Sequence, residues 1–154
     1  MTRSGRVAFT AMKEVVFGIP AAQAISDVVA QVDAERVFLM AIGTHNRTTD
    51  EIAKIRDSIG SRLAAEFSEV PPHTPRSAVM AATDIAREAN ADLIVSVGGG
   101  SVTDAAKAVQ LCLSNGIRRS DDLDQLRPCL LYTSPSPRDC GPDLVCRLLL
   151  EKWG

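Results

Sequence analysis

The sequence predicts an α/β protein: a parallel β-sheet with helices on both of its faces. One observation is alternation, because between residues 36 and 115 short apolar runs alternate with segments whose apolar residues recur at helical spacing. A second observation is three consecutive glycines, Gly98, Gly99 and Gly100, which separate an apolar run at residues 93–97 from a helical segment. Strands that alternate with helices form parallel sheets with right-handed crossovers, and helices then cover both sheet faces.

The elements before the alternation are two short strands and a helix. Strands at residues 7–10 and 14–18 are expected to form a hairpin. Pro20 suits the first turn of a helix, where its missing N–H costs nothing. Apolar residues then recur at helical spacing: Ala22, Ile25, Val28, Val29 and Val32. Residues 36–41 follow as a buried strand, and residues 42–48 as a polar loop.

The next helix is expected to begin at a threonine cap, Thr48 or Thr49, and to end at Gly60, in the usual place for a glycine. Its inward face carries Ile52, Ile55 and Ile59. Residues 63–67 predict a strand, which prolines at positions 71 and 72 break.

A third helix is expected to start at Thr74 and Pro75 and to be closed by Asn90. Its inward residues are Val79, Ala82, Ile85, Ala86 and Ala89. The helix after the glycines ends at Asn115 and Gly116, and residues 121–126 predict one more helical turn.

The glycine stretch is the main candidate for a binding site. Three glycines allow positive φ and close approach of a ligand to the backbone, and the amides that follow lie at a helix N-terminus, which attracts anions. This pattern is typical of a phosphate cradle. The alternative is a tight turn without a ligand, in which Ser101 caps the helix and Asp104 completes a capping box. A second candidate is the loop that contains Gly43 and Thr44, because ligands of such sheets bind beyond the carboxyl ends of the strands.

The residues from Gly98 to Lys107 read Gly-Gly-Gly-Ser-x-x-Asp-x-x-Lys, which resembles the pyrophosphate loop of the iron-containing alcohol dehydrogenases. The resemblance runs from about Phe9 to Arg127, and it includes V-F-G-I-P at residues 16–20 and P-P-H-T-P at residues 71–75. The nearest branch is that of maleylacetate reductases and hydroxy-acid dehydrogenases. The resemblance implies a Rossmann-like nucleotide-binding domain without the G-x-G-x-x-G fingerprint.

The resemblance also implies an activity: hydride transfer between NAD or NADP and an alcohol, aldehyde, or hydroxy or keto acid. It implies a divalent metal, iron or zinc, held in the full-length parent by an Asp and three His of a later helical domain. The expectation is that this chain stops before that domain, so it is inactive by itself and no catalytic or metal-binding residue is assigned. The parent is expected to form a homodimer. The cofactor-binding residues that the resemblance implies are Gly98, Gly99, Gly100, Ser101, Asp104, Gly43 and Thr44.

The choice between NAD and NADP stays open. The family commonly places an Asp at the end of the second nucleotide strand to bind the adenosine ribose, and no carboxylate stands at residues 42–44. Thr44 or Arg47 serves a 2′-phosphate or belongs to a plain surface loop. Both histidines, His45 and His73, are interpreted as solvated loop residues, with the adenine side as an alternative for His73.

Two residues of the last long helix receive structural interpretations. Lys107 is expected to pair with Asp104 across one helical turn, and the alternative is that it leans toward the phosphate. Cys112 is interpreted as a small apolar filler.

Two other functions of the protein remain as alternatives: a relative of dehydroquinate synthase or glycerol dehydrogenase, and a non-enzymatic nucleotide-binding module. The serine that follows the glycines argues against the first of these.

Composition narrows the class of protein further. The chain has 154 residues, enough for one domain with a core, and a formal net charge of −2, which gives no electrostatic case for nucleic acid. No apolar run reaches the length that spans a membrane. The basic N-terminus is not followed by a long apolar stretch, so no signal peptide is expected and the predicted location is cytoplasmic.

The composition changes abruptly after Pro128, and the single Tyr and Trp, Tyr132 and Trp153, both lie beyond it. Residues 129–139 resemble the translation of a transposase adapter used in DNA sequencing, and residues 143–150 resemble the flow-cell end of the same adapter. The sequence therefore predicts a partial dinucleotide-binding domain at residues 1–127, cut off in mid-gene, and a non-native tail at residues 128–154 without a consistent place in the fold. The alternative is a Pro/Ser linker and a short amphipathic helix.

Overall fold

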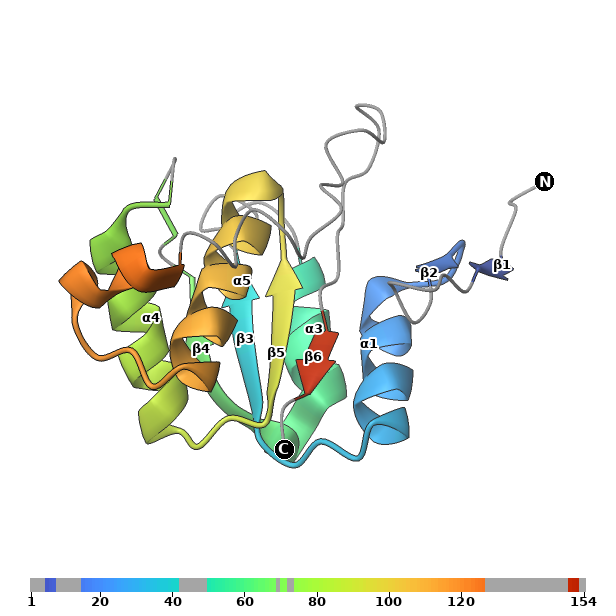
Figure 1. Ribbon diagram of the computed structural model, residues 1–154. Helices are drawn as coiled ribbons and strands as arrows, with labels where there is room; N and C mark the ends of the chain where they lie inside the picture. Colours follow the sequence, from blue (N-terminus) through green and yellow to red (C-terminus); the bar gives the residue numbers. More distant parts are fainter. Residues whose placement is uncertain are drawn as a thin grey trace.

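A computed structural model describes residues 5–7, 15–41, 50–68, 70–71, 74–126 and 150–152 of the chain. Its centre is a four-stranded sheet with the order β4-β3-β5-β6. β3 (Val37–Ala41) pairs in parallel with β4 (Leu63–Phe67) on one side and with β5 (Leu93–Val97) on the other. The predicted parallel sheet and the adjacency of β3 and β5 are therefore confirmed (Figure 1).

Helices cover both faces of the sheet, as the sequence predicts (Figure 1). α1 (Ala21–Gln31) and α3 (Glu51–Ile59) pack on one face, and α4 (Arg76–Glu88) and α5 (Gly100–Ser114) pack on the other. Two 3₁₀ helices, η1 (Gly60–Arg62) and η2 (Ser120–Leu126), complete the helical elements of the described residues. The turn expected at residues 121–126 is confirmed as part of η2.

The two terminal pieces of the described chain differ from their predicted form. The N-terminal hairpin exists, but its strands are β1 (Gly5–Val7) and β2 (Val15–Phe17). β6 (Leu150–Lys152) pairs antiparallel with β5, so the expectation that the tail has no consistent place is wrong for these three residues. Residues 127–149 lie outside the described part, and the adapter origin of the tail stays a prediction.

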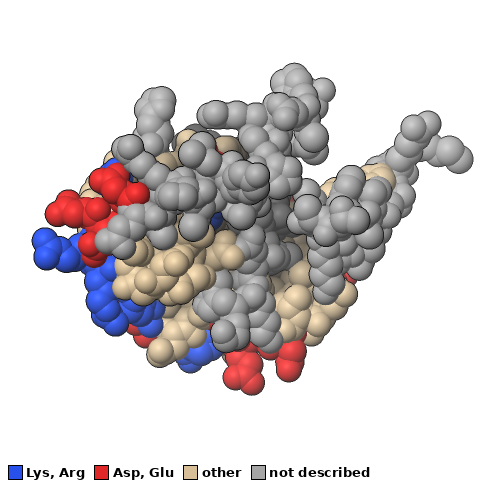
Figure 2. All heavy atoms as spheres, in the orientation of Figure 1, with Lys and Arg blue, Asp and Glu red and all other residues tan. Residues whose placement is uncertain are grey.

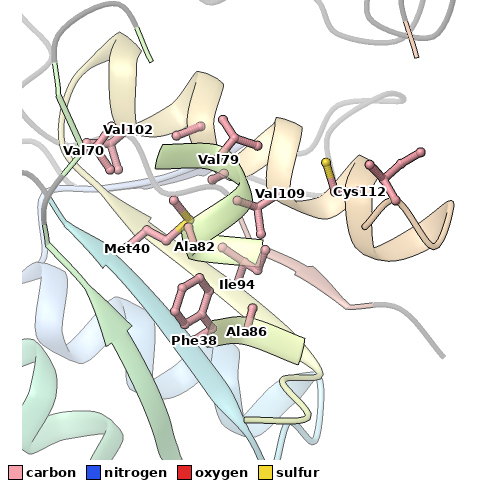
Figure 3. Close-up of a cluster of buried hydrophobic side chains, with 13 residues drawn as sticks. Phe38, Met40, Val70, Val79, Ala82, Ala86, Ile94, Val102, Val109 and Cys112 are labelled. Carbon is pink, nitrogen blue, oxygen red and sulfur yellow. The ribbon is translucent and has the colours of Figure 1, made fainter. Parts of the chain in front are cut away.

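β3 is buried on both sides, which explains its nearly continuous apolar sequence. Side chains alternate along a strand, so Phe38 and Met40 enter the core under α4 and α5, while Val37 and Leu39 enter the core under α1 and α3. Figure 3 shows Phe38 and Met40 beside Ile94 and Ala82 in the first of these cores. The sheet thus separates two hydrophobic clusters and joins them into one domain.

On α3 and α4 most of the residues predicted to face inward are buried, with one omission on α4. Ile52, Ile55 and Ile59 are buried on α3, and the buried positions of α4 are Val79, Ala82, Thr83 and Ala86. Thr83 was not predicted; its hydroxyl donates to the carbonyl of Val79 at 2.7 Å, which satisfies the buried polar group. Ile85 and Ala89 are only partly buried.

Three helices end in the same way, with a left-handed residue after the last turn. Asp33 follows α1 with φ 53°, Asn90 follows α4 with φ 47°, and Gly116 follows α5 with φ 65°. After α5, the N–H of Ile117 bonds to the carbonyl of Cys112 at 2.9 Å, which is the 6→1 bond of a Schellman motif. Equivalent bonds close α1 and α4. The predicted ends at Asn90 and Gly116 are confirmed.

The start of α3 corrects a prediction. The residue before the helix is Asp50, which has helical φ and ψ, and its side chain makes no capping hydrogen bond. Thr48 and Thr49, the expected caps, lie outside the described residues. Gly60 ends this helix with φ 60°, as expected.

A bidentate ion pair joins α3 to β4. Arg56 Nε and Nη2 lie 2.6 and 2.7 Å from the carboxylate oxygens of Glu66, and these hydrogen bonds raise the pKa of Arg56.

The amino-terminal ends of β3 and β5 are tied together. The Asp92 carboxylate accepts bonds from the backbone N–H groups of Glu35 and Arg36 at 2.9 and 3.0 Å, and its own N–H donates to the Arg36 carbonyl at 2.9 Å. Arg36 Nε donates to the carbonyl of Ala89 at the end of α4, at 2.6 Å. These contacts fix the register of the two central strands at the edge where they begin.

Candidate functional site

The glycine stretch lies at the carboxyl edge of the central strands. Ala41 and Val97, the last residues of β3 and β5, are register partners, so both strands end at this edge. In Figure 1 the arrowheads of β3 and β5 point to the same edge, where α5 begins. Gly98 is buried and has φ 150°, a value that favours glycine, and Gly99 is the residue before the helix.

The predicted cap of the helix is wrong, because the helix starts two residues earlier than a cap at Ser101 implies. α5 begins at Gly100, and the cap position belongs to Gly99, which has no side chain to make a capping bond, rather than to Ser101. Ser101 is thus the second helical residue, so Ser101 and Asp104 do not form a capping box. The first backbone bond of the helix runs from the N–H of Thr103 to the carbonyl of Gly99 at 3.2 Å.

The space around the turn is open. Among the described residues, a Cβ placed on Gly99 or Gly100 meets no atom within 4 Å outside its chain neighbours and the helix backbone. Gly99 also has φ −85° and ψ −166°, an extended conformation that any residue adopts. Neither packing nor backbone conformation in the described protein therefore requires a glycine at position 99. A ligand that approaches the backbone closely gives a reason for it.

The first turn of α5 presents N–H groups without intrahelical partners. Because the first bond of the helix is donated by Thr103, the N–H groups of Gly100, Ser101 and Val102 precede the regular ladder. The helix macrodipole adds partial positive charge at this end. Together these groups favour an anion such as phosphate in the open space.

The loop before α4 borders this turn. Thr74 Oγ1 donates a hydrogen bond of 2.9 Å to the carbonyl of Ser101, 27 residues further along the chain. The sequence places Thr74 only at a helix start, whereas the structure places it against α5. No signal in the sequence indicates this contact, because it depends on how the α4 and α5 segments pack.

The other predicted site residues divide into two groups. Asp104 is exposed on α5, and within the described residues it makes no ion pair with Lys107, so that expected pair is wrong. Gly43 and Thr44 lie outside the described residues, as do Arg47 and both histidines. Their predicted roles in binding the ribose or adenine stay predictions.

Cys112 is a core residue, as predicted. It belongs to α5 and is fully buried, and burial raises the pKa of its thiol. Within the described part of the chain, no group of three or more His, Cys, Asp or Glu side chains is placed to hold a metal ion. No helix there is long and apolar enough to cross a membrane.

The charged surface is mixed in sign. Figure 2 shows acidic and basic side chains gathered next to each other at the edge formed by α4 and η2. Arg76 Nη2 lies 2.5 Å from Asp124 Oδ1, and Arg119 Nη2 lies 3.8 Å from Asp121 Oδ2. Neighbouring charges of opposite sign cancel at a distance, so this edge offers no extended basic surface for nucleic acid.

An open glycine turn and a helix N-terminus at the carboxyl ends of parallel strands are typical of the α/β proteins that bind nucleotides at this edge. The particular family follows from comparison of sequences. The chain belongs to the iron-containing alcohol dehydrogenase family, whose sequence model matches residues 12–136. The matched range includes residues 129–136, which the sequence assigns to the tail.

Individual relatives agree with this assignment. The chain is 31% identical to a maleylacetate reductase of Sphingobium indicum over 99 residues, 64% of this chain and 27% of the relative. It is 30% identical to an NAD-dependent methanol dehydrogenase of Bacillus methanolicus over 108 residues, 69% of this chain and 28% of the relative. The predicted relation to maleylacetate reductases is thus confirmed.

A solved structure supports the same relation. The crystal structure of maleylacetate reductase from Rhizobium sp. strain MTP-10005 matches with a TM-score of 0.60 and 28% identity, over 71% of this chain and 31% of that chain. This chain therefore spans less than a third of the length of the relatives named here.

Proposed function

We propose that residues 98–102 bind the pyrophosphate of NAD or NADP. In this proposal the chain is the nucleotide-binding part of an oxidoreductase that transfers a hydride between this cofactor and a small alcohol, aldehyde, or hydroxy or keto acid. The observation that carries the proposal is the space at Gly99, where a Cβ meets no atom of the described residues although the backbone conformation accepts any residue. Membership of a family whose relatives are named dehydrogenases and reductases supports the reaction class.

Each residue of the turn has a stated role in this proposal. Gly98 reverses the chain at the end of β5 with a φ of 150°. Gly99 leaves room for the pyrophosphate, and the N–H groups of Gly100, Ser101 and Val102 donate to its oxygens. When bound, the nicotinamide supplies the hydride chemistry, while the protein binds and orients the cofactor.

The metal in the family name is not assigned to residues of this chain. The described residues contain no group of three potential ligands, so they do not fit a metal site. The proposal therefore assigns substrate polarisation to none of the described residues.

The test is the substitution Gly99→Val in the whole 154-residue chain. Valine accepts the extended backbone of Gly99, so the stability loss should stay near ~1 kcal/mol, typical of a poor N-cap residue. Its side chain occupies the space left for the pyrophosphate, so binding of NADH and NADPH should fall below detection. Fluorescence titration gives the dissociation constants, and thermal unfolding gives the stability.

The matched control is Ala30→Val, which adds a β-branched side chain to an exposed position at the far end of α1. This variant should bind both cofactors as the unsubstituted chain does. Titration with NADH and NADPH side by side also decides the cofactor preference. Binding by Gly99→Val at the affinity of the unsubstituted chain contradicts the proposal.

A further inference from the structure

Thr74 has a backbone conformation that is unfavourable for two reasons, its own side chain and the proline that follows it. Its φ is +45°, in the left-handed region, where a β-branched side chain is a genuine outlier. It also precedes Pro75, and the residue before a proline is normally pushed to extended conformations. A residue held against both preferences is kept there by its surroundings, and such residues cluster at functional sites.

Two hydrogen bonds hold Thr74 in place. Its N–H donates to the carbonyl of Pro71 at 3.3 Å, which closes the loop on itself. Its hydroxyl donates to the carbonyl of Ser101 at 2.9 Å, which joins the loop to the first turn of α5. The first bond is local, whereas the second links two elements and depends on the hydroxyl of this residue.

The second bond acts on one peptide group of the candidate site. The carbonyl of Ser101 and the N–H of Val102 belong to the same planar peptide unit and point in opposite directions. A donor on the carbonyl therefore fixes the orientation of the Val102 N–H and, by polarisation, strengthens it as a donor. This matters here because α5 begins with two flexible glycines, Gly99 and Gly100, which do not fix the helix start by themselves.

We propose that Thr74 is a positioning residue for the pyrophosphate site, and that its hydroxyl holds the Ser101–Val102 peptide so that the Val102 N–H faces the bound anion. This inference rests on the proposed function of the glycine turn. The strained backbone of Thr74 is the cost of bringing its hydroxyl to the Ser101 carbonyl.

The experiment compares three substitutions in the whole chain. Thr74→Val keeps the branched shape and removes the hydroxyl, so it should weaken binding of NADH or NADPH about fivefold, the effect of one lost hydrogen bond. Thr74→Ser keeps the hydroxyl and should bind within about twofold of the unsubstituted chain. Thr74→Gly relieves the backbone strain and removes the hydroxyl, so it should unfold at a higher temperature and still bind more weakly.

Hydrogen exchange of the α5 amides gives a readout without ligand. Exchange at Gly100, Ser101 and Val102 should be faster in Thr74→Val and unchanged in Thr74→Ser, while exchange in the centre of the sheet stays the same. Thr74→Gly keeps the test open should Thr74→Val fail to fold, since glycine adopts this φ without strain.

The outcomes separate the two proposals. Loss of binding in Gly99→Val together with normal binding in Thr74→Val, or equal weakening in Thr74→Val and Thr74→Ser, overturns the role of Thr74 alone. Normal binding in Gly99→Val overturns the pyrophosphate site. Absence of NADH and NADPH binding in the unsubstituted chain overturns both.

Discussion

The two edges of the sheet differ in how their backbone groups are satisfied. At the amino-terminal edge, the Asp92 carboxylate takes the N–H groups of Glu35 and Arg36, and Arg36 in turn bonds to the end of α4. At the carboxyl edge, the glycines leave open space, the first amides of α5 have no intrahelical partner, and Thr74 is held in a left-handed conformation.

This difference separates stability from binding. Hydrogen bonds between groups of the protein stabilise the folded state, and these groups are then not available to bind a ligand. Groups that stay open, and a residue held under strain, lower the stability and gain their favourable contacts only when a ligand arrives. Substitutions at the two edges should therefore affect different measurements.

The largest expected effect concerns catalysis, which requires more than the carboxyl edge offers. We expect the 154-residue chain to show no steady turnover of NADH or NADPH with any alcohol, aldehyde or hydroxy acid. Hydride transfer requires nicotinamide, substrate and a polarising group within contact distance, and the proposed function places only the pyrophosphate site here. Steady-state absorbance at the NADH wavelength is the measurement, and turnover that a chelator abolishes contradicts this prediction.

A large effect on stability is expected at the amino edge. Asp92→Ala removes the acceptor of two backbone N–H groups and should lower the free energy of unfolding by about 2 kcal/mol, since charged acceptors make the stronger bonds. The dissociation constant for NADH, measured below the unfolding transition, should not change.

The control for Asp92→Ala is Asp84→Ala, which removes an exposed carboxylate that pairs with Arg87 within α4. Such a pair contributes only a few tenths of a kcal/mol. A change in NADH affinity in Asp92→Ala would show that the two edges are coupled, against the comparison drawn above.

A smaller effect is expected at the end of α5. Gly116 has φ 65° in the Schellman motif, and a Cβ there meets no atom of the described residues. Gly116→Ala should therefore lower the stability only through the strain of the left-handed conformation. We expect a loss of about 1 kcal/mol in chemical denaturation and unchanged cofactor affinity. A matched change is Ser114→Ala in the last turn, which should be neutral or slightly stabilising. Equal effects of the two substitutions would contradict the role given to Gly116.

The sequence predicts the sheet and the helices well because their signals are local and repeated. The apolar runs of β3 and β5 indicate strands by their short length, and the isoleucines of α3 indicate a helix by their spacing. Gly60 and Gly116 end helices because only glycine adopts their φ without cost. The three consecutive glycines are an equally local signal, and the turn that they predict lies between β5 and α5 in the structure.

The parts that were missed depend on contacts between distant segments. Ser101 is an ordinary capping residue, but α5 already begins at Gly100 in the structure. The bond from Thr74 to Ser101 and the bonds of Asp92 to the start of β3 each require packed elements. Propensity and spacing contain no information on such contacts, and Gly43 and Thr44 remain predictions.

The central place of β3 also determines the order in which this domain can form. β3 pairs with β4, which follows it closely, and with β5, whose tie from Asp92 reaches Arg36 across 56 residues. Closing such a long loop is slow, because chain entropy is lost before the contacts form. As the chain leaves the ribosome, β3 and β4 can pair early, while the second edge of β3 stays exposed until β5 emerges. During that interval the nascent sheet has an apolar, unpaired edge, so this is when the protein is most prone to aggregate.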